Sequence, residues 1–174
     1  MIIALLATHV AAMVTWVFAV SWEIKRNEQL IAADGAMDSL HEGFHRLRTF
    51  YRIMAAQLIA IVASLPLWHY DKAMTASMVG LLALFAGYFT RVFNTSLNIA
   101  RGKAKFYASV DPHAALFPDR LAVYVAKECE REHGTPWAEY LPLAYEAILN
   151  VAAGLCAILY VAALATAIWL VFQK

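Results

Sequence analysis

Four long runs of apolar residues dominate the chain, and more polar stretches separate them. The runs cover residues 1–22, 53–70, 73–94 and 147–172. A helix needs about 20 apolar residues to cross the roughly 30 Å of hydrocarbon in a bilayer. The pattern therefore predicts an all-α fold, a polytopic four-transmembrane-helix bundle with a helical cytoplasmic layer, formed as a single integral membrane domain over residues 1–174.

The ends of these runs carry turn and cap signals. Only two residues separate the second run from the third, so their helices should be antiparallel neighbours. Gly134 is expected to end one helix in the left-handed conformation. Thr135 is the expected N-cap of the next helix and Pro136 its first turn, while Pro142 should interrupt that helix before it enters the membrane.

The basic residues predict the orientation. Nearly all Lys and Arg residues lie in two places: just after the first run, and at the end of the third run or after it. The two exceptions are Lys72 and Lys174. The positive-inside rule then places both long connections in the cytoplasm. The first run has no basic residue before Glu23, unlike a signal peptide, so we expect it to be retained. Both termini should lie outside, most simply across a bacterial inner membrane.

The two long connections, residues 23–52 and 95–146, are predicted to be helical. Apolar residues at spacings of three and four mark an amphipathic helix before the second run; they are Met37, Leu40, Phe44, Leu47 and Tyr51. The third helix is expected to continue through residues 95–110, with Ile99 and Phe106 on one face. A further helix is predicted over residues 119–132.

Composition excludes some functions. The formal charge is only +1, which gives no basis for nucleic-acid binding. The two cysteines, Cys129 and Cys156, are far apart in sequence, which is typical of thiols rather than of a disulfide framework.

The strongest chemical motif is HEGFH at residues 41–45. On a helix, His41 and His45 lie one turn apart on one face, a spacing that suits two ligands of zinc or iron. Asp38 projects from the same side as a third ligand, and Glu42 would be the general base that activates a bound water. Other candidates for the third ligand are Glu128, Glu132, His133 and Glu146. The alternative is that HEGFH is only the polar flank of the amphipathic helix.

A second candidate is His9, which lies inside the first apolar run. An ionisable residue within a membrane span is a functional candidate by default, and this one would bind haem or contact a quinone. The alternative is a neutral histidine that forms hydrogen bonds within the bundle.

Several other residues are predicted to hold the helices together. Charges stand at the cytoplasmic ends of different runs, and some should pair across helices; they are Glu23, Arg52, Arg91 and Glu146. Small residues on the third and fourth runs would allow close helix approach; they are Gly80, Ala83, Gly87, Ala147, Gly154 and Ala157. Gln57 and Asn150 are candidates for hydrogen bonds between helices.

Two classes of function follow. The first is a non-catalytic subunit or interaction partner of a larger membrane complex, which docks other membrane-protein subunits or a second copy of itself through residues 95–146. The second is a metal-dependent membrane enzyme built on residues 41–45. A haem- or quinone-associated subunit that uses His9 is a further alternative.

Overall fold

The structure, a computed structural model, describes residues 2–34, 41–100, 102–110 and 117–173. Within this part of the chain every regular element is helical. In chain order these are α1 (Ile2–Asp34), α2 (His41–Ser64), the 3₁₀ turn η1 (Leu65–Leu67), α3 (Asp71–Tyr88), the π-helix η2 (Phe89–Phe93), α4 (Asn94–Ala100), α5 (Phe117–His133) and α6 (Trp137–Phe172).

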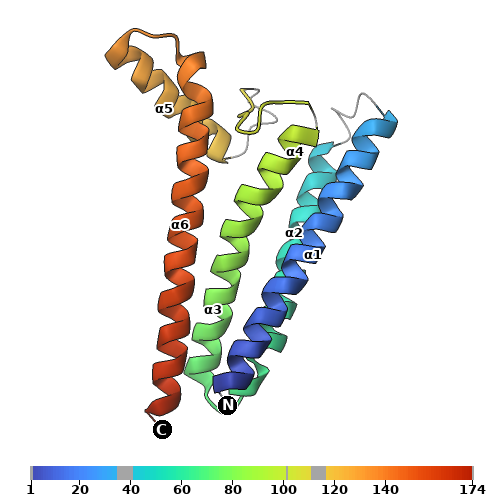
Figure 1. Cartoon of the computed structure of the whole chain (residues 1–174), viewed down its shortest axis with the longest axis vertical. Coiled ribbons are helices and arrows are strands. Elements are labelled where there is room, and N and C mark those ends of the chain that lie inside the picture. The colour runs from blue at the N-terminus through green and yellow to red at the C-terminus, as the bar shows by residue number, and fades with distance from the viewer. Residues whose placement is uncertain (1, 35–40, 101, 111–116, 174) are drawn as a thin grey trace.

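The four long helices run antiparallel to their chain neighbours (Figure 1). Helices α1, α2 and α3 pack together, and α6 packs along α3 on the side away from α1 and α2. Both termini lie at one end of the bundle, and α5 lies at the opposite end against the beginning of α6. The predicted antiparallel packing of the second and third runs is confirmed, because α2 turns through η1 directly into α3.

Three helices are long and apolar enough to cross a membrane, which indicates a membrane protein. They are Ile2–Arg26, Asp71–Ser96 and Trp137–Phe172. The fourth predicted span is less clear, since the apolar segment formed by the end of α2 and by η1 covers only Arg52–Leu67. At 1.5 Å per residue this segment is about 24 Å long, shorter than the hydrocarbon layer.

Two helix boundaries differ from the prediction. Pro142 does not interrupt α6, which continues unbroken from Trp137 to Phe172. A proline this close to a helix start removes a single backbone hydrogen bond, and packing against α5 supports this part of α6. The N-cap of α6 is Pro136 rather than Thr135, whereas Gly134 adopts the predicted left-handed conformation, with φ at 72°.

The helix after the third run also ends earlier than predicted. Helix α4 stops at Ala100, and Gly102 follows with φ at 67°. The Asn98 side chain donates hydrogen bonds to the carbonyls of Lys105 and Tyr107, at 3.3 and 2.8 Å. The side-chain amide thus holds a non-helical loop where the apolar spacing predicted a continuous face, so Ile99 and Phe106 do not share one helix.

Small residues of α3 bring α3 and α6 together, as predicted. The small residues predicted for the same role on α6 do not lie in this contact. Gly80 and Gly87 are buried against Ala163 and Cys156 of α6. On α6, Gly154 has no atom near its missing Cβ, and Ala147 and Ala157 are exposed. Gln57 and Asn150 are exposed as well. Only 11% of the most apolar window of α6 is buried, so this helix presents a long apolar surface away from the bundle.

A second packing centre joins α5 to the beginning of α6. Small residues of α5 lie against larger ones of α6 in a buried cluster, which comprises Ala108, Ala122, Ala126, Leu141, Ala144, Tyr145 and Leu149. Buried Asp119 accepts a hydrogen bond from the backbone N–H of Ser109 at 3.0 Å. The carboxylate thereby ties the loop before α5 to the hairpin that α5 and α6 form.

Candidate functional site

The best-developed polar site lies between α1, α2 and α3, in the half of the bundle away from the termini. Arg52 on α2 forms an ion pair with Glu23 on α1, with 2.7 Å between Nη2 and Oε1. The Arg52 guanidinium also lies over the rings of Phe89 and Phe93, 4.8 and 4.4 Å from their centroids. Such a cation–π contact is worth about 0.5–2 kcal/mol, depending on how far the cation is removed from water.

The π-helix η2 supplies both of these rings. Phe89 and Phe93 are its first and last residues, and their rings stack with centroids 4.7 Å apart and planes 14° apart. A π-turn holds one more residue than an α-turn and is often found at functional sites. Phe89 and Phe93 are four positions apart and lie on one face of the helix, where both rings contact the Arg52 guanidinium.

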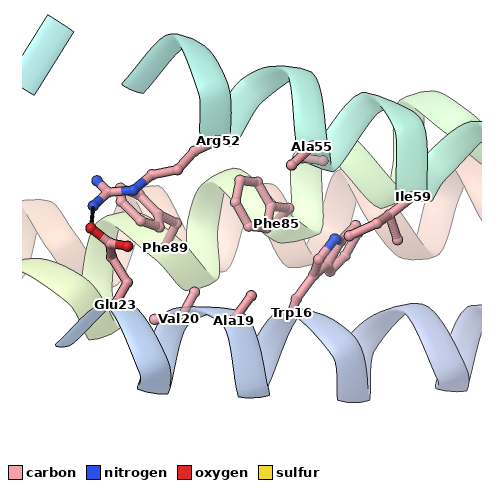
Figure 2. Close-up of a pocket in the computed structure, with 10 residues that line it drawn as sticks. Trp16, Ala19, Val20, Glu23, Arg52, Ala55, Ile59, Phe85 and Phe89 are labelled. Atoms are coloured by element: carbon pink, nitrogen blue, oxygen red, sulfur yellow. Dashed lines mark hydrogen bonds and ion pairs between the residues drawn. The ribbon is translucent and has the colours of Figure 1, made fainter. Parts of the chain in front are cut away.

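A cavity of about 130 Å³ lies next to this ion pair (Figure 2). Its wall is mainly apolar. It is formed by Trp16, Ala19, Val20 and Glu23 of α1, by Arg52, Ala55, Ala56 and Ile59 of α2, by Phe85 of α3 and by Phe89 of η2. Glu23 and Arg52 stand at one end of the cavity and Trp16 at the other.

Trp16 is the unusual member of this wall. The side chain is only 3% exposed, and its Nε1–H has no hydrogen-bond partner among the described residues. In Figure 2 the indole nitrogen lies on the part of the ring directed toward α2. A buried donor without an acceptor costs about 1–3 kcal/mol, and such groups are rare in native proteins. Trp16 is therefore a buried hydrogen-bond donor whose partner is not found among the described residues.

His9 lies nearer the end of the bundle that holds the termini, at the centre of a buried hydrogen-bond network. It is 1% exposed. Its Nε2 lies 2.7 Å from Oγ of Ser77 on α3, and its Nδ1 lies 3.2 Å from the hydroxyl of Tyr160 on α6. Ser77 is in turn 2.8 Å from Oγ of Ser64 on α2. The network thus connects all four long helices.

Thr8, beside His9, adds a further bond between α1 and α2. Its hydroxyl donates to the carbonyl of Ala63 at 2.9 Å and to that of Leu5 at 2.8 Å.

A haem ligand would need a ring nitrogen on His9 that is not in a hydrogen bond, and both nitrogens are in hydrogen bonds. This arrangement favours a role in holding the bundle together over one in ligation.

The HEGFH motif forms the first turn of α2, as the helical spacing requires. The side chains of His41, Glu42 and His45 are outside the described part of the structure, and so is Asp38. The metal site proposed on these residues therefore stays a prediction.

The other suggested ligands lie elsewhere in the fold; they are Glu128, Glu132 and His133 on α5 and Glu146 on α6. Helix α5 packs on α6, whereas α2 packs on α1 and α3, and in Figure 1 α5 and α2 stand on opposite sides of α3. The described residues contain no group of three or more His, Cys, Asp or Glu side chains placed to hold a metal ion.

The four charges expected to pair have different surroundings. Glu23 and Arg52 come together, as described above. Arg91 is exposed and Glu146 partly exposed, and within the described residues neither forms an ion pair. Arg91 lies inside η2, two residues from Phe89 and two from Phe93, and the rings of both phenylalanines contact Arg52.

Sequence reasoning missed the aromatic residues around Arg52. Nothing in the sequence distinguishes these residues from the other members of the apolar runs; they are Trp16, Phe85, Phe89 and Phe93. One signal was available: Trp16 and Glu23 are seven residues apart and therefore lie on the same face of α1. A second signal was the spacing of four residues between Phe89 and Phe93, which places them on one face of a helix; the π-turn itself has no signal in the sequence.

Comparison with known proteins adds no relative. No family model matches the chain, and no curated protein and no solved structure is significantly similar to it.

Proposed function

We propose that this chain is a small integral membrane protein that acts as a non-catalytic subunit of a larger membrane complex and docks its partner through α5. The observation that carries the proposal is a stripe of exposed apolar side chains on α5, formed by Phe117, Leu121 and Tyr124. Phe117 is 76% exposed and Tyr124 is 61% exposed.

The stripe faces away from the rest of the protein. Its members are spaced by four and three residues, so they share one face of the helix. The opposite face of α5 carries buried Asp119, Ala122 and Ala126, which pack toward α6 and its preceding loop. Exposed aromatic residues grouped on one surface are typical of sites that bind another protein.

The exposed face of α6 supports a partner that is itself a membrane protein. Small side chains form a shallow apolar groove on this helix, lined by Ala157, Ile158, Val161, Ala162 and Ala165. Small residues allow a second helix to approach closely within the bilayer. A membrane partner could therefore extend along α6 while it contacts the stripe on α5.

The proposal includes four membrane crossings, with both termini outside and α5 in the cytoplasm. The distribution of Lys and Arg supports this topology. Helix α2 and the turn η1 would form the fourth crossing, and local thinning of the bilayer would accommodate their short apolar segment, Arg52–Leu67. Holding Arg52 against Glu23, Phe89 and Phe93 would lower the cost of a charge at this depth.

Topology can be tested with the natural thiols. Cys129 on α5 is partly exposed, and Cys156 lies in the middle of α6. A membrane-impermeant maleimide should label Cys129 in inverted vesicles and leave it unlabelled in intact cells. A Cys129→Ser variant identifies the labelled site. Labelling of Cys129 in intact cells would contradict the orientation.

Docking can be tested by photo-cross-linking in native membranes. A photoreactive amino acid at Tyr124 or Phe117 should give a discrete protein adduct, and the same amino acid at exposed Glu139 on α6 should not. Tyr124→Glu should release the chain from its complex in a native gel while its helix content stays unchanged. If Tyr124 cross-links only to lipid, and the chain migrates alone, the docking proposal fails.

A further inference from the structure

The loop that follows α4 folds back on the end of that helix and is held there by backbone and side-chain hydrogen bonds. Gly102 closes α4 in the left-handed conformation, and the N–H of Lys103 donates to the carbonyl of Asn98 at 2.9 Å. The Asn98 amide in turn donates to the carbonyls of Lys105 and Tyr107. One asparagine thus fixes the backbone at three positions of the loop.

The loop lies at the depth of the lipid headgroups. The candidate span Asp71–Ser96 has 26 residues. At 1.5 Å per residue it is about 39 Å long, which exceeds the roughly 30 Å of hydrocarbon and reaches into the headgroup layer. Asn98 follows the end of this span by two residues. Because Asn98 binds the backbone of Lys105 and Tyr107, the loop returns to that level instead of continuing away from the membrane.

The loop carries positive charge in a segment without acidic residues. Residues 72–110 contain no Asp or Glu. Lys103 and Lys105 are exposed, and neither forms an ion pair with a described residue. Asp119, the next described acid along the chain, is buried and accepts the N–H of Ser109. Both ammonium groups are therefore open to a ligand that carries negative charge.

Two aromatic rings position these ammonium groups. Nζ of Lys103 lies 5.3 Å from the centroid of the Tyr107 ring, and Nζ of Lys105 lies 5.0 Å from that of Phe106. A cation over a ring face is attracted to it, and an ammonium has three N–H donors that can still reach an acceptor. Tyrosine is also enriched where membranes meet water, and Tyr107 is exposed. Lysines held among aromatic residues at this depth fit the phosphate of a lipid headgroup.

We propose that residues 102–107 form a binding site for the headgroup of an anionic phospholipid. The ammonium groups of Lys103 and Lys105 donate hydrogen bonds to phosphate oxygens, and the Tyr107 ring lies among the headgroups. A zwitterionic lipid has the same phosphate beside a cation, which opposes the two lysines and weakens binding. The proposal goes beyond the docking function and uses no residue of the stripe on α5. It requires the span Asp71–Ser96 but neither orientation of the protein, so it can fail independently of the proposed function.

The test uses native mass spectrometry of the full-length protein, with phosphatidylglycerol and phosphatidylcholine of the same acyl chains as probes. The wild-type chain should bind phosphatidylglycerol more tightly. The double variant Lys103→Gln with Lys105→Gln removes both cations from an exposed loop. It should weaken phosphatidylglycerol binding about 30-fold, the size expected for two lysines near an anionic surface, and leave phosphatidylcholine binding unchanged. Lys103→Arg with Lys105→Arg keeps both charges and should bind like the wild type.

A matched control removes two cations from α5 instead. Lys127 is exposed and lies over the Trp137 ring, with 5.8 Å between Nζ and the ring centroid, and Arg131 is exposed as well. Lys127→Gln with Arg131→Gln changes the net charge by the same amount and should keep phosphatidylglycerol binding. An equal loss in this control would show that net charge alone attracts the lipid, and would overturn the proposal. Unchanged binding by the Lys103 and Lys105 glutamine variant would overturn it too.

Two further outcomes exclude other ligands of the same loop. Ammonium phosphate that replaces ammonium acetate at equal ionic strength should not displace phosphatidylglycerol; complete displacement would mean that the loop binds free phosphate and would contradict a lipid site. If the Lys103 and Lys105 glutamine variant keeps its lipid and instead releases a co-purified protein, the loop binds protein and the proposal fails.

Discussion

Gly87 on α3 lies so close to Cys156 on α6 that a Cβ atom on the glycine would stand 2.6 Å from the Cβ of the cysteine. Gly80, seven residues earlier on the same face, approaches Ala163 of α6 in the same way, at 3.0 Å. These two glycines allow the backbones of α3 and α6 to meet along most of their length. In the bundle of long helices, α6 packs mainly on α3, so this seam determines how α6 is held.

Gly87→Ala should therefore separate α3 from α6. The added methyl group has no room, and overpacking of this kind costs about 1–3 kcal/mol. The free energy of unfolding, measured in mixed detergent, should fall by that amount. Gly154→Ala is the control, because a Cβ there meets nothing within 4 Å; it should leave stability unchanged or raise it. Equal stability for Gly87→Ala and the wild type would contradict the described seam.

His9→Ala should loosen the bundle at the end that holds the termini. It removes the partner of both Ser77 and Tyr160, and hydrogen bonds between membrane helices contribute about 0.6–2 kcal/mol. Thermal unfolding followed by circular dichroism should show a lower midpoint. Thr15→Ala, which removes only a bond to the carbonyl of Ala11 on an exposed face, should not change it. A Soret absorbance band in the wild type that His9→Ala abolishes would show instead that His9 binds haem.

Arg52→Lys should be intermediate between the wild type and Arg52→Gln. The lysine keeps the charge opposite Glu23 but loses the flat guanidinium that stacks on Phe89 and Phe93. We expect a loss of about 1 kcal/mol in the free energy of unfolding, the size of a partly buried cation–π contact. Arg131→Lys, at an exposed pair with Glu128, is the matched control and should change little. An Arg52→Lys protein as stable as the wild type would mean that the stacked geometry contributes nothing.

Metal content distinguishes the docking proposal from the enzyme alternative. If HEGFH is the polar flank of a helix, the purified protein should hold well below one zinc or iron ion per chain. His45→Ala should then leave the metal content and the stability unchanged. Elemental analysis that finds one ion per chain in the wild type, and none in His45→Ala, would support the metal site on Asp38, His41 and His45 and contradict the flank interpretation.

Apolar patterning predicted the helical class of the fold because lipid exposure demands unbroken apolar segments, which are visible in any window of the sequence. The fourth span is less clear than the other three, because its apolar segment, Arg52–Leu67 at the end of α2 and in η1, is shorter than theirs. The prediction that Pro142 interrupts α6 was wrong. The general rule for proline takes no account of how close the residue lies to the start of the helix, or of the packing of α6 against α5.

The candidate site was harder to predict because it depends on contacts between helices. Some pairing among Glu23, Arg52, Arg91 and Glu146 was expected from their place at the ends of the apolar runs, but the sequence did not indicate which two would meet. The burial of Trp16 without an acceptor was not expected, since it depends on how α2 and α3 enclose its ring. The hydrogen-bond network around His9 could not be predicted either. It depends on Ser77 and Tyr160 approaching His9 from two other helices, and on Ser64 of a third helix contacting Ser77.

The π-turn at Phe89–Phe93 also affects where this helix tolerates a change in length. A π-turn takes up one extra residue inside an otherwise regular helix, so the α-helix on either side keeps nearly its own rotational register. In the regular part of α3, by contrast, each residue advances about 100° around the axis. A deletion there would turn α4, and the loop that Asn98 holds, by that angle relative to α1 and to Asp119 on α5. A one-residue deletion within Phe89–Phe93 should therefore be tolerated better than a one-residue deletion in α3.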